Sequence, residues 1–163
     1  MVDAITSSKN LSVRKQLQDW FSSESGTLLL QEESEKLAQR LNALFGYHIL
    51  QIGDIGGTDF LGSSRILHKM IARLVPGEQG GHRSDFCCDC TNLPVASGSI
   101  DVVVLPHVLE FEANPHQVLR ESERVLIGEG HVVILGFNPW SLWGLWRLGL
   151  GWREKTPWQG RYI

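Results

Sequence analysis

The stretch LQIGDIGG, from Leu50 to Gly57, is an apolar run that leads directly into three glycines. Such a run is typical of a buried strand that ends in a loop where the backbone can approach a nucleotide. Many loops of this kind read G-x-G-x-G, whereas Ile55 stands at the middle glycine position here. Alone, the stretch is either a cofactor loop with one substitution or a glycine-rich turn between a strand and a helix.

On both sides of this loop, helix patterns alternate with strand patterns. Apolar periodicity predicts helices over residues 10–21, 28–44 and 114–127, with a break at residues 22–26, and a short helix within residues 59–68. Gly46 is the expected C-terminal cap of the second helix, and the GEG at residues 128–130 is expected to end the helix over residues 114–127. Strands are expected over residues 47–53, 69–75, 84–88, 99–107 and 131–137. The alternation predicts an α/β fold, a Rossmann-like and mainly parallel sheet with helices on both faces.

Length and charge narrow the class of protein. The chain has 163 residues, 42% of them hydrophobic, and a net charge of -3, as in an ordinary globular domain. This charge gives no strong signal for nucleic acid or an anionic membrane. The amino terminus lacks the pattern of a signal peptide, and no apolar run reaches the length of about 18 residues that a transmembrane helix needs. We therefore expect a cytoplasmic protein without a transmembrane segment.

The three cysteines, Cys87, Cys88 and Cys90, all lie in DFCCDC. Cys87 and Cys90 form a C-x-x-C pair, but a structural zinc site needs four ligands and no second pair follows at a suitable spacing. The histidines show no metal-ligand spacing either. We expect no metal site and interpret the cysteines as small buried apolar residues at a strand end.

Four segments occur in a fixed order from Leu50 to Phe137: IGDIGG, DCTNLPVASGSIDVVV, VLEF and RVLIGEGHVVILGF. Together they resemble the class I S-adenosylmethionine-dependent methyltransferases, and within them the small bacterial "type 11" kind. That group runs from a glycine loop through D-x-x-x-LP and S-x-D-x-V to R-V-L-x-x-G-G. The segment GFNPWSLWGLW also looks like bacterial members of the group.

The resemblance implies S-adenosyl-L-methionine as the cofactor and assigns residues to it. The glycines of the loop would let the backbone approach its amino acid part, Asp89 would accept from the adenine amino group, and the amide of Cys90 would bind a ring nitrogen. Leu105, Pro106 and His107 would line the wall near the sulfonium. The implied cofactor-binding residues are Gln51, Gly53, Asp54, Gly56, Gly57, Asp89, Cys90, Leu105 and Pro106.

The sequence also departs from the family pattern. Gln51 replaces the acid before the first glycine, and Arg73 or Leu74 stands where a ribose-binding acid should end the second strand; Glu78 could substitute only if its loop folds back. Ile55 adds a branched side chain. Because the sulfonium cofactor is a cation, the loss of two acids should weaken its binding.

His107 is the candidate catalytic residue, as a general base, because it follows the fourth strand where a methyl acceptor should lie. The alternative is a histidine that stacks on the cofactor wall or caps the next turn. Glu110 also has two possible roles: it contacts the acceptor, or it is a solvated residue of a turn.

The chain is expected to divide into N-terminal helices that pack on the core (residues 1–46), a cofactor-binding core (47–137) and a Trp-rich segment (138–163). That last segment is too short for the family's final helix and two strands, so either the product is truncated or the sheet stops near five strands. Its tryptophans could cover a sheet edge or a homodimer contact, lie on a membrane surface, cover an apolar acceptor or stack on a base. They are Trp140, Trp143, Trp146, Trp152 and Trp158.

Two functions from different classes follow. One is an S-adenosylmethionine-dependent methyltransferase that acts on an unidentified acceptor, small or apolar in character. The other is a non-catalytic binding or scaffold protein that kept the fold and lost the cofactor. A nicotinamide-dependent oxidoreductase is disfavoured, because the glycines do not follow G-x-G-x-x-G. The sequence names neither the acceptor nor the oligomeric state.

Overall fold

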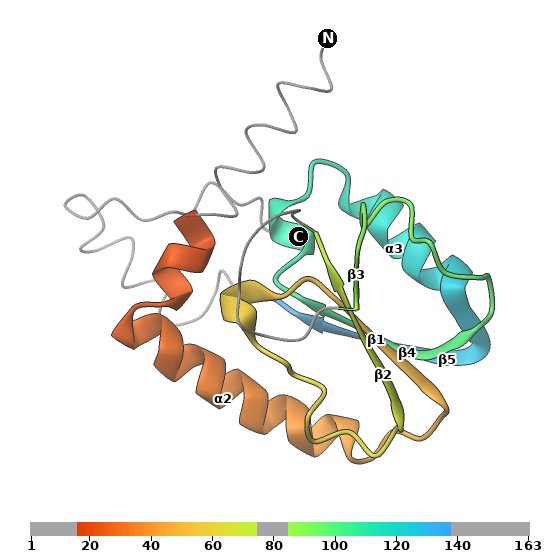
Figure 1. Cartoon of the computed structure of the whole chain (residues 1–163), viewed down its shortest axis with the longest axis horizontal. Helices are drawn as coiled ribbons and strands as arrows, with labels where there is room; N and C mark the ends of the chain where they lie inside the picture. Colours follow the sequence, from red (N-terminus) through yellow and green to blue (C-terminus); the bar gives the residue numbers. More distant parts are fainter. Residues whose placement is uncertain (1–15, 75–84, 138–163) are drawn as a thin grey trace, which may run out of the picture.

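The computed structural model describes residues 16–74 and 85–137, and the structural statements below concern these residues. The Trp-rich segment, Glu78 and the first 15 residues lie outside them. One five-stranded sheet forms the centre, with the strand order β3-β2-β1-β4-β5 and every neighbouring pair parallel (Figure 1). The strands are β1 His48–Ile52, β2 His68–Arg73, β3 Phe86–Cys87, β4 Ile100–Pro106 and β5 Leu126–Leu135. The predicted Rossmann-like parallel sheet is confirmed.

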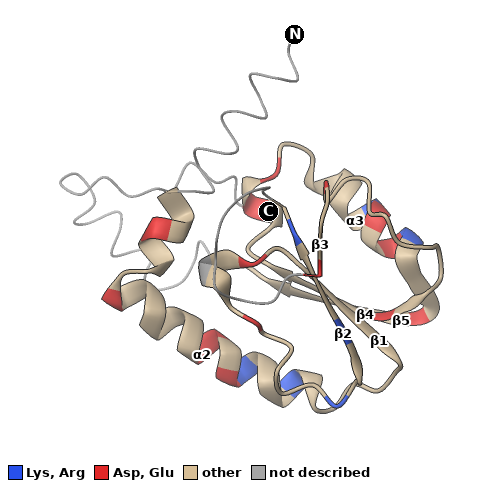
Figure 2. Cartoon of the chain, in the orientation of Figure 1, with Lys and Arg blue, Asp and Glu red and all other residues tan. Residues whose placement is uncertain are grey.

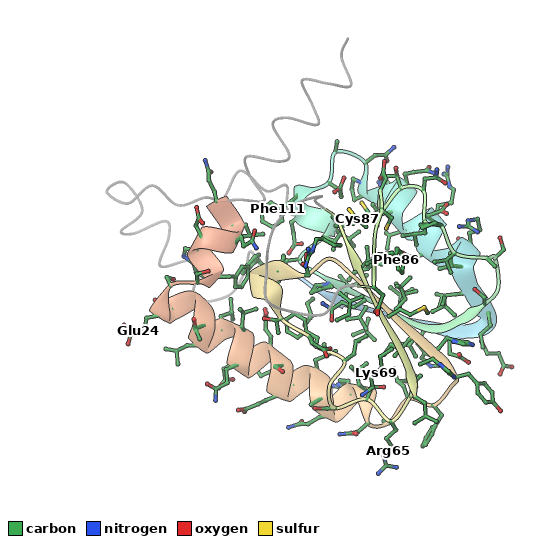
Figure 3. All side chains as sticks on the ribbon, viewed as in Figure 1. Glu24, Arg65, Lys69, Phe86, Cys87 and Phe111 are labelled. Atoms are coloured by element: carbon green, nitrogen blue, oxygen red, sulfur yellow. The ribbon has the colours of Figure 1, made fainter. Side chains whose placement is uncertain are left out.

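The strand order reverses beside β1. The chain moves outward from β1 to β2 and β3, then returns to place β4 on the other side of β1. The connections that leave β1 and β4 therefore run to opposite faces of the sheet, and in parallel sheets ligands bind at the carboxyl ends of two such strands. Figure 3 shows Cys87 and Phe111 at this end of the molecule, whereas Arg65 and Lys69 lie at the other end.

Helices cover both faces of the sheet, as the alternation of apolar residues along the strands requires. Val102 and Val104 of β4 face the cluster that contains Leu30, Leu37 and Leu41 of helix α2, Glu24–Leu41. Val103 and Leu105 face the opposite cluster, which contains Val118 and Val125 of helix α3, Pro115–Val125. Figure 1 shows α2 and α3 on opposite sides of the sheet. Each such buried side chain contributes about 1.5–3 kcal/mol of apolar burial.

The expected break between two helices is confirmed at Ser22 and Ser23, but it is shorter than the predicted residues 22–26, because α2 begins at Glu24. Ser23 is the N-cap, and its hydroxyl accepts from the Gly26 amide at 3.2 Å. Gly26 lies inside the helix, and any side chain there would overlap the backbone of Trp20 and Phe21 in the preceding helical turns, residues 16–21. The serines and the glycine of this segment therefore have two roles: Ser23 caps α2, and Gly26 allows the two helices to pack closely.

Gly46 does not cap α2, which ends with Asn42 as its C-cap. A Cβ on Gly46 would instead meet the side chain of Asp101. The Asp101 carboxylate accepts from the amides of Tyr47 and His48, at 2.9 and 2.8 Å, and so fixes the entry into β1. The glycine is needed because this carboxylate occupies the space of a side chain.

Two further expected boundaries differ in the structure. Helix α3 ends at Val125, and residues 128–130 lie inside β5, where the register moves from Ile100↔Leu126 to Val102↔His131 and leaves extra residues as a bulge. Between residues 59 and 68 the chain forms turns, and the short helix lies earlier, as the 3-10 helix η1, Ile55–Gly57.

Charged residues of both signs occur along α2 and α3 (Figure 2). Within the described ranges, no helix is both long and apolar enough to span a bilayer.

Candidate functional site

The loop after β1 can be built only with glycine at its first position. Gly53 has φ +93 and Gly57 has φ +67, both in the left-handed region that disfavours other residues. A Cβ on Gly53 would lie 3.1 Å from Cγ2 of Val108, on the segment that follows β4. The side chain of Ile55 packs against the α2 side of the core, so its branched group is directed into the protein interior. The substitution at the middle glycine position therefore adds to the core.

Gln51 organises this loop from within the sheet. Its buried side-chain amide donates to the carbonyls of Gly53 and Thr58, at 2.8 and 2.9 Å, and its oxygen accepts from the Phe60 amide at 3.0 Å. Both N–H groups and the oxygen are engaged inside the loop. This geometry supports a role in holding the loop rather than the direct cofactor contact that the resemblance implies.

An ion pair joins the glycine loop to the end of β2. Arg73 Nε donates to Asp54 Oδ2 at 2.9 Å, and both side chains are largely buried. Arg73 stands where the family places its ribose-binding acid, so the structure sets a cation there and pairs it with Asp54.

The loop that carries Asp89 and Cys90 follows β3 and is anchored to α3. Asp89 is exposed, and its Oδ1 accepts from the amide and the hydroxyl of Thr91, at 2.8 and 2.7 Å, which closes a tight turn. Arg124 on α3 donates to the Leu93 carbonyl at 3.0 Å. Asp89 thus presents its carboxylate at the rim of the sheet, while Cys90 is buried.

The three cysteines differ in burial: Cys90 is buried as predicted, Cys88 is half-buried, and Cys87 is exposed. Burial, with smaller contributions from Cys87 and Asp89, raises the pKa of the Cys88 thiol to about 11, so this thiol stays protonated at neutral pH. No group of three or more potential ligands that could hold a metal ion is found among the described residues.

His107 follows β4 and is held in an unusual way. It is the one non-glycine residue of the described chain with a positive φ, +49, and it is buried. Its Nε2 lies 3.0 and 3.1 Å from the two carboxylate oxygens of Glu33 on α2, and its Nδ1 lies 3.4 Å from Oε1 of Glu110. Backbone strain of this kind is concentrated at functional positions.

The two carboxylates determine the protonation of His107. Burial alone would lower its pKa, but hydrogen bonds and charges from Glu110 and Glu33 outweigh burial and raise the pKa to about 9. At neutral pH the ring is an imidazolium that donates on both sides, which leaves no lone pair to remove a proton from a substrate. The general-base role stays a prediction that this geometry does not favour.

Glu110 is not the solvated turn residue that the sequence suggests. It lies in the 3-10 helix η2, Leu109–Phe111, and its side chain is only 10% exposed. Oε1 accepts from the Phe137 amide at 2.8 Å, and a Cβ on Gly136 would lie 3.1 Å from the same oxygen. The second oxygen, Oε2, is buried and has no hydrogen-bond partner.

Several residues of this cluster were missed in the sequence. Phe21 and Phe137 pack against the ring of His107, with centroid distances of 5.3 and 4.2 Å. Glu33 had a detectable signal, because it falls three residues after Leu30 and four before Leu37 on the apolar stripe of α2. A single acid on an apolar stripe indicates a buried charge with a partner elsewhere.

The predicted wall residues lie deeper than expected. Leu105 is fully buried in the core cluster on the α3 face, so only its backbone can face a ligand. Pro106 pairs with Leu135 at the end of β4 and is buried as well. The structure thus brings together the glycine loop and the His107 segment, and it places Asp89 at the rim.

Comparison with known proteins shows which class of proteins shares this fold. Residues 66–134 match the model of a family described as a methyltransferase domain. An S-adenosylmethionine-dependent methyltransferase from Thermotoga maritima, described as a possible histamine N-methyltransferase, superimposes with a TM-score of 0.61 over 80% of this chain and 64% of its own, at 19% identity. The chain has the fold of the class I methyltransferases, and the resemblance found in its motifs is confirmed.

Two further relatives were found. The chain is 35% identical over 118 residues to the uncharacterized protein YafS of Escherichia coli, which covers 72% of this chain and 47% of YafS. The chain therefore spans about half the length of this curated relative. The partner of the Trm112 methyltransferase activator in a Haloferax volcanii complex superimposes with a TM-score of 0.53 at 20% identity, over 72% of this chain and 57% of its own.

Proposed function

We propose that this domain binds S-adenosyl-L-methionine in the crevice above the carboxyl ends of β1 and β4 and transfers its methyl group to an acceptor. The observation that carries the proposal is the convergence of the glycine loop, with Gly53 against Val108, and the His107 segment at the point where the strand order reverses. The family match over residues 66–134 supports the same activity.

The described residues fit most of this cofactor. The left-handed Gly53 and Gly57 give the backbone access that its amino acid part needs, and the exposed carboxylate of Asp89 can accept from the adenine amino group. Asp54 could accept from a ribose hydroxyl if Arg73 released it. When bound, the cofactor supplies an electrophilic methyl group on a sulfonium.

Methyl transfer to a nucleophile depends mainly on position, so the chain's own contribution is alignment and exclusion of water. The Gln51 amide fixes the loop on one side of the crevice through its three hydrogen bonds. The clasp of His107 between Glu33 and Glu110 fixes α2 and η2 on the other side. Both groups act by holding backbone in place.

Cofactor binding is tested by calorimetry with S-adenosylmethionine and S-adenosylhomocysteine on the wild-type chain and on Gly53→Ala. We expect one saturable site that the substitution weakens, because it adds a Cβ at a left-handed position beside Val108. Gly62→Ala is the matched control, since a Cβ there meets nothing within 4 Å. Equal binding by both variants would place the cofactor elsewhere.

One observation favours the second candidate, a binding or scaffold protein without cofactor. In the pair between Arg73 and Asp54, the guanidinium lies beside the proposed cofactor site, and its positive charge would repel the positively charged sulfonium. For that candidate the same titration gives no heat with either compound and no thermal shift at millimolar concentration.

We expect the predicted homodimer to form through the edge strand β5. Val132 and Ile134 are 39% and 50% exposed, and β5 is the last strand in the order of the described sheet. An exposed apolar edge favours contact with another chain. Light scattering on Ile134→Lys tests it, because a homodimer through this edge should dissociate. The cytoplasmic location stays a prediction.

A further inference from the structure

One buried atom in the cluster beside His107 has no partner. Oε2 of Glu110 makes no hydrogen bond, although its sister oxygen accepts from the Phe137 amide and faces His107. A buried acceptor that stays unsatisfied costs about 1–3 kcal/mol, and more when it is charged. Such an atom in a folded protein indicates a missing partner.

Charge leads to the same conclusion. The cluster places two acidic side chains, Glu33 and Glu110, around a single histidine, so acidic groups outnumber basic ones there. The rings of Phe21 and Phe137 lie against His107 and make the surroundings apolar. Among the charged groups of the described residues, Glu33 from α2 and Glu110 from η2 are those that contact the ring. An excess buried charge is costly unless a cation or a hydrogen-bond donor joins it.

The position of this atom relates it to the reaction. Glu110 is tied to Phe137 and Gly136 after β5, and to His107 after β4. It therefore lies at the same end of the sheet as the glycine loop, one strand beyond the crevice. A group held at Oε2 would be on the side of the cofactor site where β4 and β5 end.

We propose that Glu110, backed by Glu33, binds the nitrogen of the methyl acceptor, so that the acceptor class is an amine with an apolar body. This inference rests on the proposed methyltransferase function and adds the substrate class. The ammonium donates to Oε2, and the apolar body packs on the partly exposed ring of Phe137. A neutral alcohol would leave the extra charge uncompensated, and a carboxylate would add to it.

The same contact prepares the nitrogen for reaction. An ammonium has no lone pair, so one N–H bond must break before the nitrogen can act as a nucleophile. The proton moves to Oε2 of Glu110, where an O–H bond forms, and the electrons of the broken bond stay on nitrogen as its lone pair. Glu110 then takes the role of base that the sequence suggested for His107, whose two N–H groups are already donated.

The test uses three probes of one shape: phenethylamine, 2-phenylethanol and phenylacetate. Each is titrated into the full chain by calorimetry, with and without saturating S-adenosylhomocysteine. We expect the amine to bind and the other two to bind at least about tenfold more weakly, as for the loss of a charged hydrogen bond. Glu110→Gln should weaken amine binding by about 10- to 100-fold, and by a larger factor than it weakens S-adenosylhomocysteine binding. Glu123→Gln, on the exposed side of α3, is the matched control and should change neither.

A second readout needs no variant. An ammonium beside Glu110 places a positive charge near His107, so phenethylamine should lower the pKa of that ring, seen by NMR titration, while 2-phenylethanol should leave it unchanged. Equal binding of amine and alcohol, undiminished amine binding in Glu110→Gln, or an unmoved pKa would overturn the inference. If S-adenosylhomocysteine fails to bind, the proposed function fails, and the titrations without it still decide whether this is an amine site.

Discussion

The loop after β1 and the cluster after β4 both follow the carboxyl ends of neighbouring parallel strands, and they use polar atoms in opposite ways. In the loop, the uncharged amide of Gln51 is satisfied on both its nitrogen and its oxygen by the backbone. In the cluster, His107 has a positive φ, and its ring lies between the carboxyl groups of Glu33 and Glu110. Oε2 of Glu110 has no hydrogen-bond partner. The first arrangement pairs every polar atom of its side chain, whereas the second leaves one carboxylate oxygen without a hydrogen-bond partner.

The contrast changes the meaning of the family acid's loss at Gln51. A carboxylate at this position could attract the cationic cofactor but would supply no donor for the carbonyls of Gly53 and Thr58. The Gln51 amide carries no charge, but its three hydrogen bonds hold the loop in place. The acidic side chains beside His107 are those of Glu33 and Glu110.

The largest effect is expected from removing the cation of the cluster. His107→Leu leaves two largely buried acids, 15% and 10% exposed, without it, and we expect a loss of about 3–5 kcal/mol in the free energy of unfolding. Urea denaturation at neutral pH measures this loss. His116→Leu, on the exposed surface of α3, is the control and should change stability by less than about 0.5 kcal/mol. Similar effects of both substitutions would mean that the clasp does not hold the fold.

The pH dependence of stability should identify the same residue. The folded pKa of His107 is raised to about 9 from 6.5, so its contribution is complete below pH 6.5 and is lost as the pH rises through 9. The total is on the order of 3 kcal/mol. The difference in unfolding free energy between wild type and His107→Gln should therefore shrink across this range. A difference that stays constant would show that the ring does not titrate there.

Restoring the family acid should harm the loop. In Gln51→Glu, a carboxylate oxygen would face the carbonyls of Gly53 and Thr58 in place of a donor, at distances of 2.8 and 2.9 Å for the present nitrogen. We expect a stability loss of about 2–3 kcal/mol and weaker cofactor binding. Thermal unfolding and calorimetry measure the two effects. Tighter binding of S-adenosylmethionine would show that Gln51 contacts the ligand directly.

The smallest effect is expected at the end of β2. Arg73→Gln removes a cation beside the loop, so binding of the sulfonium cofactor should improve relative to the neutral S-adenosylhomocysteine, by less than about tenfold. Raising the salt concentration should reduce this difference, since Arg73 and Asp54 are partly exposed. An unchanged ratio of the two affinities would place Arg73 too far from the sulfonium to affect it.

The sequence predicts the strands and the crevice well, because apolar alternation and the β-branched run of β4 are local signals. It predicts the role of the glycines less well. Gly26 is needed because the backbone of Trp20, in the preceding helix, leaves no room for a side chain, and Gly46 is needed because Asp101, far away in the chain, fills the same space. The cluster around His107 depends on Glu33, which is 74 residues away. Pairing of this kind follows from how α2 packs on the sheet and leaves only one local trace, an acid on an apolar stripe.

The central claim is that the crevice above β1 and β4 binds S-adenosyl-L-methionine through the loop at Gly53. Calorimetric titration of the wild-type chain, with Gly53→Ala and Gly62→Ala in parallel, tests it most directly. We predict one saturable site in the wild type and in Gly62→Ala, and much weaker binding in Gly53→Ala. No heat and no thermal shift in the wild type at millimolar cofactor would contradict the claim and leave a methyltransferase fold that works as a binding or scaffold protein.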